Sequence, residues 1–183
     1  NVHVIVTENA YIPVWGTYIT TPTATKEFAK VNVQTKIVLP EGADASKYSV
    51  KTSVWNPNGQ KLTEQTIPLS QIKYNDNSLS QEFIIQTPTL WSPDMPALYS
   101  AETRLYEGDQ LKDIYTTPFG IRSIEIIPNK GFFLNGEKTV FKGVCNHHDL
   151  GPLGAAVNDA AIRRQIRILK DMGCNAIRTS HNM

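Results

Sequence analysis

The stretch KVNVQTKIVL, residues 30–39, decides how the first two thirds of this chain fold. Apolar and polar residues alternate along it. The residues that share its apolar face are Val31, Val33, Ile37 and Leu39, and those opposite are Asn32, Gln34 and Lys36. Successive side chains of a strand point to opposite faces, so a period of two is typical of a strand half-buried against a core. The stretch therefore predicts a β-strand with one apolar face.

Similar short runs recur through the first part of the chain. They lie at residues 48–55, 79–87, 98–106 and 111–117, and turn-forming sequences separate them at residues 40–42, 56–59, 75–77 and 107–109. Several short strands divided by turns within about 100 residues indicate an immunoglobulin-like β-sandwich. The region lacks the Cys pair of antibody domains, so its core is expected to rest on the apolar strand faces and on Trp55 or Trp91.

The pattern changes after residues 119–122 (FGIR). Two apolar runs, residues 132–134 and 139–141, flank Asn135-Gly136, a dipeptide that suits the positive-φ positions of a type I′ turn. This arrangement predicts a hairpin. We expect its second arm to continue through residues 142–145.

An amphipathic helix is predicted over residues 159–172. Its apolar stripe follows the spacing i, i+4, i+7 and consists of Ile162, Ile166 and Leu169. Asn158 is the expected N-cap and Gly173 the expected C-cap. A short strand at residues 174–179 follows. Strand, loop, helix and strand in this order form a βαβ unit, which implies two neighbouring parallel strands.

Composition narrows the classes of function. The chain has 183 residues, of which 40% are hydrophobic and 19% charged, with a formal net charge of +1. This balance is typical of a globular protein and provides no strong electrostatic field to attract nucleic acid or an anionic membrane.

Cys145 and Cys174 have neither a disulfide framework nor C-x-x-C metal spacing, so we expect two buried thiols. A lone βαβ unit cannot cover both faces of its sheet, so we expect the natural polypeptide to continue beyond Met183.

Histidines and an arginine lie where the two predicted parallel strands end. His147 and His148 follow the first strand, while Arg178 and His181 lie at the end of the second. Ligand sites gather at the carboxyl ends of parallel strands. From spacing alone, a functional and a structural role for His147 and His181 are equally favoured. A metal site and nucleophilic catalysis are disfavoured, because no further ligand, second-shell partner or nucleophile motif accompanies these residues.

Carboxylates are scarce near these strand ends. Glycoside hydrolysis needs two acidic side chains, about 5–5.5 Å apart for retention or about 6.5–9.5 Å for inversion. The acids of this part of the chain are Glu125, Glu137, Asp149, Asp159 and Asp171. Only Asp149 is expected near the strand ends, and one acid does not make a pair.

Several motifs resemble those of family 2 glycoside hydrolases. FGIR (119–122), FLNG (133–136) and KGVCNH (142–147) resemble the entry into that family's catalytic barrel. GCNAIRTSH (173–181) resembles its second barrel strand. LWSP (90–93) and PALY (96–99) resemble part of its immunoglobulin-like domain. In order and spacing, these matches cover residues from about 20 to 183. The variations resemble β-galactosidases more than β-glucuronidases.

The resemblance implies a mainly β chain, an immunoglobulin-like β-sandwich followed by a truncated (β/α)8 barrel start. Residues 1–20 would be the tail and linker of a preceding jelly-roll domain, residues 21–121 the sandwich, and residues 122–183 the start of the TIM barrel. The parent would be a retaining exo-glycosidase that hydrolyses β-galactosides through a covalent glycosyl-enzyme. Its general acid/base and nucleophilic glutamates are expected beyond Met183, so the chain alone is predicted to be inactive.

The resemblance also assigns roles to site residues. His147 and His181 would contact the sugar, and Arg178 would hold the nucleophilic carboxylate ionised. His148 and Asp149 are weaker candidates, because the family often shows N-R-H-E or N-K-H-E around the first histidine. No catalytic residue, metal or cofactor is expected in this chain, although a divalent cation elsewhere in the full barrel stays open.

The expected partner is a β-galactoside, with no nucleic acid or membrane, and a periplasmic or secreted location is favoured over the cytoplasm. Exposed apolar surface and unpaired strand edges in an incomplete barrel favour self-association of the chain. The alternative hypothesis is an extracellular immunoglobulin-like carbohydrate-binding or adhesion module without hydrolase activity.

Overall fold

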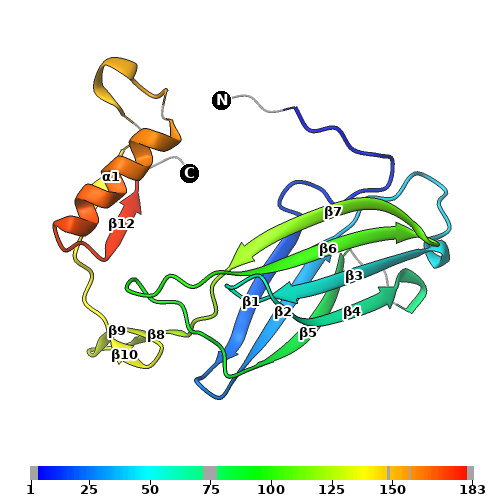
Figure 1. The fold of residues 1–183 in the computed structure, drawn as a ribbon, viewed down its shortest axis with the longest axis horizontal. Coiled ribbons are helices and arrows are strands. Elements are labelled where there is room, and N and C mark those ends of the chain that lie inside the picture. The colour runs from blue at the N-terminus through cyan, green and yellow to red at the C-terminus, as the bar shows by residue number, and fades with distance from the viewer. Residues whose placement is uncertain (1–3, 72–77, 148, 157, 181–183) are drawn as a thin grey trace. The chain divides into compact units, whose positions relative to one another are not determined.

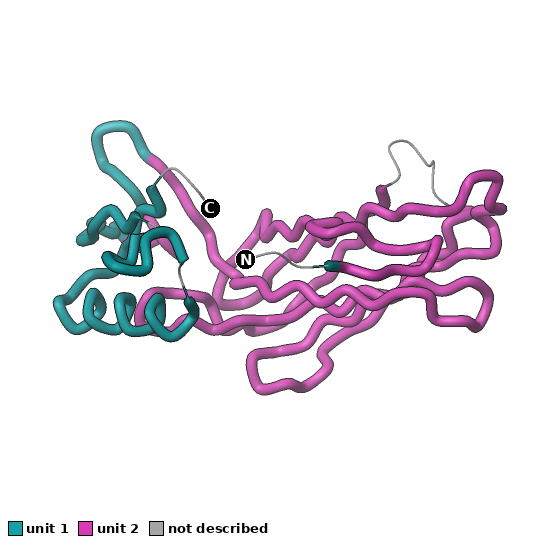
Figure 2. Tube along the Cα trace, turned by 90° about the horizontal axis from the view of Figure 1, so that it is seen from above, with its two compact units in different colours: residues 1–4, 127–132, 138–183 teal, residues 5–126, 133–137 magenta. Residues whose placement is uncertain are grey.

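The computed structural model describes residues 4–71, 78–147, 149–156 and 158–180. Its contacts divide the chain into two compact units (Figure 2). The sandwich unit comprises residues 5–126 and 133–137. The C-terminal unit comprises residues 127–132 and 138–183, together with residues 1–4.

Two antiparallel sheets build the sandwich unit (Figure 1). One sheet has the order β1-β2-β5, with β1 at Thr17–Ala24, β2 at Phe28–Lys36 and β5 at Ser78–Gln86. The other has the order β4-β3-β6-β7, with β3 at Tyr48–Trp55, β4 at Lys61–Pro68, β6 at Tyr99–Glu107 and β7 at Gln110–Phe119. The prediction of a mainly β chain with an immunoglobulin-like sandwich is confirmed.

The alternating runs correspond to β2, β3, β5, β6 and β7, whereas β1 and β4 were not predicted. In β2 and β5 every second residue is buried over most of the strand, as the period of two requires. β1 and β4 lie at sheet edges and contain no fully buried residue, so neither shows that period.

The sandwich core consists of two apolar clusters with a polar layer in between. The first includes Ala29, Val31, Val33, Val54, Phe83, Ile85, Tyr99, Ala101, Phe119 and Ile121, and the second includes Ala10, Ile12, Ile37, Tyr48, Val50, Leu69, Leu79 and Leu105. Along β3, β5 and β6 the buried residues Thr52, Gln81 and Thr103 separate the two clusters. Trp55 and Trp91 are only half-buried, so the expectation that either would anchor the core is wrong.

A hydrogen bond joins the two sheets through this polar layer. The Thr52 hydroxyl donates to Oε1 of Gln81 at 2.6 Å, and Nε2 of Gln81 donates to the carbonyl oxygen of Gln65 at 3.0 Å. Since a buried polar group without a partner is costly, these bonds favour one alignment of the sheets over others.

Residues that precede β1 also belong to the packed sandwich. Ala10 and Ile12 lie in its core, and the Ile12 N–H donates to Oδ2 of Asp113 at 2.8 Å. The packed region therefore begins before residue 21, and the domain boundaries expected at residues 20 and 121 stay predictions.

A small sheet of order β10-β9-β8 follows the sandwich, with β8 at Ile124–Ile127, β9 at Gly131–Leu134 and β10 at Glu137–Lys138. Asn135 and Gly136 have φ of 52° and 80°, which fits the predicted hairpin turn. The second arm ends at Lys138 and does not run on to Cys145 as expected. Instead, β11 (Gly143–Asn146) starts anew and pairs in parallel with β12 (Ala176–Thr179).

The helix α1 (Asp159–Asp171) follows β11 and the short turn η3 (Gly151–Leu153). The Asn158 side chain accepts from the Ala161 N–H at 2.9 Å, which confirms the predicted N-cap. Gly173 has φ of 85° and lies one residue after the actual C-cap, Met172, in a Schellman motif.

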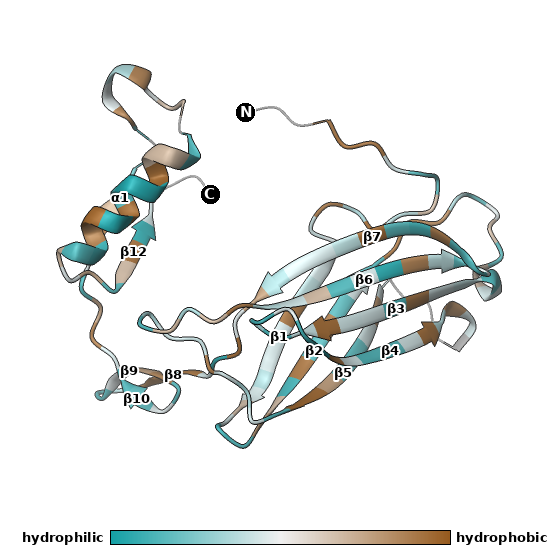
Figure 3. Ribbon diagram, viewed as in Figure 1, coloured by the Kyte–Doolittle hydropathy of each residue, from teal (hydrophilic) through white to brown (hydrophobic). Residues whose placement is uncertain are grey.

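Apolar and polar residues alternate around α1 (Figure 3). Ile162 and Leu169 are half-buried, whereas Ile166, the third residue of the predicted stripe, is 46% exposed. No helix in the described part of the chain is long and apolar enough to cross a membrane.

Candidate functional site

β11 and β12 bring the predicted site residues to the same edge of a parallel sheet. Cys145 lies opposite Arg178 and Asn146 opposite Thr179 in the register, so both strands end on the same side. The Ser180 N–H donates to the Asn146 carbonyl oxygen at 3.1 Å, which extends the pairing beyond β12. His147 directly follows β11 and is exposed. The predicted βαβ unit with parallel strands is confirmed.

Arg178 contacts Cys145 across the two strands. Its Nη1 donates to Sγ of Cys145 at 3.7 Å. Cys145 is exposed and Cys174 is half-buried, so the expectation of two buried thiols is wrong. The physical reason is the width of the sheet, since two strands cannot enclose the side chains that stand on them.

A cavity of about 390 Å³ lies over this strand pair. Its lining consists of Phe141, Gly143, Val144, Cys145, Ala176, Ile177 and Arg178. The walls are apolar apart from one guanidinium and one thiol. A guanidinium in such a place can hold a carboxylate through two charge-assisted hydrogen bonds.

Asp149 has a local structural task. Its Oδ1 accepts from the N–H of Gly151, two residues further on, at 2.8 Å, which forms an Asx turn just before η3. The other two predicted site residues of this region, His148 and His181, lie outside the described residues.

Two residues that sequence reasoning missed hold the strand pair together. The Asn175 side chain accepts from the Lys142 N–H at 2.8 Å and donates to the Val140 carbonyl oxygen at 3.0 Å. Gly143 leaves no room for a side chain, because a Cβ there would clash with the carbonyl oxygen of Ala176. The available signal was the position of Asn175 near the start of the strand predicted at residues 174–179; in the structure it lies directly ahead of β12.

The described residues contain no group of three or more His, Cys, Asp or Glu side chains that could hold a metal ion.

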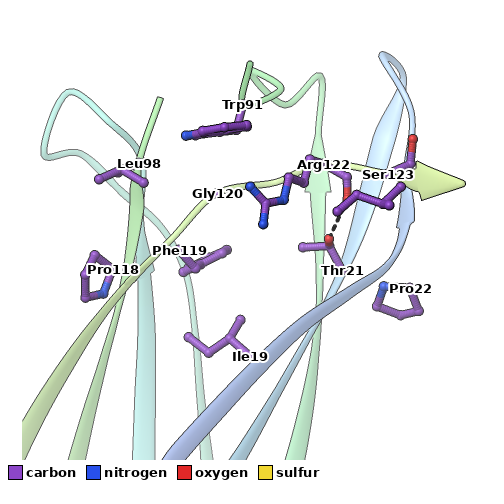
Figure 4. Close-up of a pocket in the computed structure, with 11 residues that line it drawn as sticks. Ile19, Thr21, Pro22, Trp91, Leu98, Pro118, Phe119, Gly120, Arg122 and Ser123 are labelled. Carbon is purple, nitrogen blue, oxygen red and sulfur yellow. Dashed lines mark hydrogen bonds between the residues drawn. The ribbon is translucent and has the colours of Figure 1, made fainter. Parts of the chain in front are cut away.

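A second cavity, of about 660 Å³, lies within the sandwich unit (Figure 4). The Arg122 guanidinium lies over the Trp91 ring, 4.7 Å from its centroid, and Thr21 Oγ1 donates to the Arg122 carbonyl oxygen at 2.9 Å. A Cβ at Gly120 would lie 2.9 Å from Trp91. The cavity is thus where the LWSP and FGIR motifs meet, and no acid lines it.

Asn135, in the hairpin turn, bonds to Trp91 of the LWSP motif and to Ser123, the residue directly after the FGIR motif. Its Nδ2 donates to the Trp91 carbonyl oxygen at 3.0 Å, and its Oδ1 accepts from the Ser123 N–H at 3.0 Å. The asparagine of the FLNG motif therefore has a structural role that sequence reasoning did not assign.

The chain thus joins a β-sandwich to a βαβ unit, and His147 and Arg178 lie near the carboxyl ends of its parallel strands, where α/β folds place their ligand sites. Residues 11–122 match the glycosyl hydrolases family 2, and residues 125–182 match the TIM barrel domain of that family. The chain belongs to glycosyl hydrolases family 2. Its βαβ unit is accordingly the start of a TIM barrel, as predicted.

Known relatives and structures agree with this assignment. The chain is similar to the β-galactosidase BoGH2A of Bacteroides ovatus, with 40% identity over 92% of the chain and 20% of the relative. It is also similar to a β-glucuronidase of Bacteroides fragilis, with 29% identity over 89% of the chain and 23% of the relative. The crystal structure of a family 2 member from Bacteroides cellulosilyticus superposes with a TM-score of 0.87 at 36% identity, covering 96% of this chain and 24% of that one.

The chain thus spans about a fifth of the length of the curated relatives it matches. Both β-galactosidases and β-glucuronidases occur among them.

Proposed function

We propose that this chain forms the sandwich and the first part of the barrel of a retaining exo-β-galactosidase. The single observation that carries the proposal is the register of β11 and β12, which puts Arg178 next to the strand end from which His147 emerges. The 40% identity to a relative named β-galactosidase supports the choice of sugar. The match of residues 125–182 to a TIM barrel domain gives the adhesion-module hypothesis no support.

In this proposal each site residue has a distinct task. Arg178 holds the nucleophilic carboxylate and keeps it ionised, because a neighbouring cation favours the charged form. His147 and His181 donate hydrogen bonds to sugar hydroxyls. The two glutamates that break the glycosidic bond come from other segments of the polypeptide and lie about 5–5.5 Å apart, as retention requires.

The gene product that contains this chain provides the test. With aryl glycosides as substrates, we expect kcat/KM to be highest for the β-galactoside and lower for the β-glucuronide. Substitution of Arg178 by Ala should lower kcat/KM at least about a hundredfold, the usual cost of removing one preorganised charge-stabilising group. Arg167, an exposed cation of α1, is the matched control, and Arg167→Ala should leave kcat/KM unchanged.

Two results would refute the proposal. A β-glucuronide hydrolysed faster than the β-galactoside would show that the sugar is wrong. Turnover by the isolated 183-residue chain would show that the catalytic carboxylates lie within it.

A further inference from the structure

The turn that precedes β1 holds a tryptophan in an unfavourable backbone conformation. The Gly16 N–H donates to the Pro13 carbonyl oxygen at 2.7 Å, so Trp15 is the third residue of a β-turn. Its φ is 62°, a value that this position of a turn usually reserves for Gly or Asn. Strain of this kind persists only where the surroundings impose it, and it often marks a functional position.

The surroundings of Trp15 fix the turn firmly. The Trp15 N–H donates to the Tyr115 hydroxyl at 2.9 Å, and the Gly16 carbonyl oxygen accepts from the Lys36 N–H at 2.6 Å. Gly16 is buried, and a Cβ there would lie 2.6 Å from the Pro13 carbonyl oxygen. The backbone is therefore anchored to β2 and β7, although 83% of the Trp15 surface is exposed.

Other large apolar side chains near this turn in the sequence are exposed as well. Within residues 5–18 of the sandwich unit they are Ile5, Val6, Val14, Trp15 and Tyr18. Exposed apolar residues scattered singly need no explanation. Trp15 differs from the others because its exposure coincides with an unfavourable φ in a backbone that β2 and β7 hold in place.

We infer that Trp15 anchors the sandwich unit to another domain of the same polypeptide. The relatives are about five times longer than this chain, so their polypeptides contain the further domains that such a surface requires. Tryptophan and tyrosine are the residue types that carry most binding energy at interfaces. The inference rests on family membership and on the length of the relatives, and not on the proposed β-galactosidase activity.

An apolar protein surface fits this site better than a saccharide. The Trp15 N–H, the Gly16 N–H and the Gly16 carbonyl are all used within the sandwich. The neighbour Val14 is apolar and 51% exposed. Sugar hydroxyls that lose water need hydrogen-bonding partners, whereas an apolar surface does not.

Oxidative footprinting of the three tryptophans provides the test. Trp15 should be oxidised at least tenfold faster in the isolated chain than in the full gene product, while Trp55 and Trp91 should change little. Equal oxidation rates for Trp15 in both proteins would overturn the inference. The inference would also be overturned if Trp15 of the isolated chain became protected from oxidation as the protein concentration rises, which would point to a second copy of the chain. Protection of Trp15 in the gene product only after galacto-oligosaccharide is added would overturn it too, because the occupant would then be a saccharide. A gene that encodes nothing beyond these 183 residues would overturn it too.

A pair of substitutions separates the anchor from the backbone strain. Trp15→Gly should leave the urea midpoint of the isolated chain unchanged or raise it, because glycine accepts this φ, and should lower the midpoint of the gene product. Thr87 is the matched control, since it is exposed and has φ of 43°. Thr87→Gly should shift both proteins equally. A Trp15→Gly shift that is equal in the two proteins would contradict the inference.

Discussion

The hydrogen bond between Thr52 and Gln81 should show strong energetic coupling. Both side chains are almost fully buried, and together they join the two sheets of the sandwich. Gln81→Leu removes the acceptor of the Thr52 hydroxyl and the donor to the Gln65 carbonyl oxygen. A buried polar group left without its partner costs about 1–3 kcal/mol, so we expect Gln81→Leu to destabilise the sandwich by about 2 kcal/mol.

Thr52→Val keeps the shape of the side chain and leaves Oε1 of Gln81 without its donor. We expect a cost of about 1–2 kcal/mol. The double variant removes both partners, so its cost should be smaller than the sum of the two single costs by about 1 kcal/mol or more. Thr103 limits the effect, because its hydroxyl lies 3.4 Å from that of Thr52 and can partly replace Gln81.

Urea unfolding followed by tryptophan fluorescence measures these energies. The chain has three tryptophans, Trp15, Trp55 and Trp91, all in the sandwich unit, so the signal reports on that unit. With a slope of about 2 kcal/mol per M urea, Gln81→Leu should lower the midpoint by about 1 M. Gln86, exposed at the end of the same strand, provides the control variant Gln86→Leu. The reasoning would be refuted if the costs of Thr52→Val and Gln81→Leu added up to the cost of the double variant within about 0.3–0.5 kcal/mol. It would also be refuted if Gln86→Leu lowered the urea midpoint as much as Gln81→Leu.

Three further changes test other contacts. The hydrogen bond from Lys51, with those from Ser53 and Lys61, lowers the pKa of Glu64 to about 2. The ionised Glu64 therefore stabilises the folded chain fully above its unfolded pKa near 4.5, and this stabilisation is lost as the pH falls through about 2. The urea midpoints of the native chain and of Glu64→Gln should accordingly differ at neutral pH and converge as the pH falls to about 2. Gly143→Ala should separate β11 from β12 and reduce amide-exchange protection at residues 143–146, and unchanged protection would contradict the predicted clash. Asn158→Ala should cost about 1 kcal/mol of helix stability, seen as a lower ellipticity at 222 nm, and an unchanged signal would show that the cap contributes nothing.

The sandwich was predictable where strands have one buried face. β2 and β5 show the period of two because one face of each strand is buried in the core and the other is not. β1 and β4 could not be predicted from the sequence, because edge strands with no fully buried residue show no such period. The hairpin turn was evident from Asn135-Gly136, whereas the separate start of β11 was not, since parallel pairing with a strand 33 residues away leaves no local signal.

The candidate site was predictable to a similar degree. The βαβ pattern alone was enough to place His147 and Arg178 at neighbouring strand ends. The roles of Asn135 and Asn175 could not be predicted, because both act through side-chain hydrogen bonds to backbone groups far away in the sequence. Spacing could not identify the hydrogen bond from the Gly151 N–H to Asp149 either, because the geometry of the turn decides it.

The register between β11 and β12 limits how this segment can change in length during evolution. Side chains alternate along β12, so one residue inserted between Asn175 and Arg178 would move the guanidinium to the opposite face of the sheet. The connection between β11 and α1 has no such constraint, because even doubling its length would cost only about 0.6 kcal/mol. Length variation among homologues should therefore concentrate at residues 147–157, while the spacing from Asn175 to Arg178 stays constant.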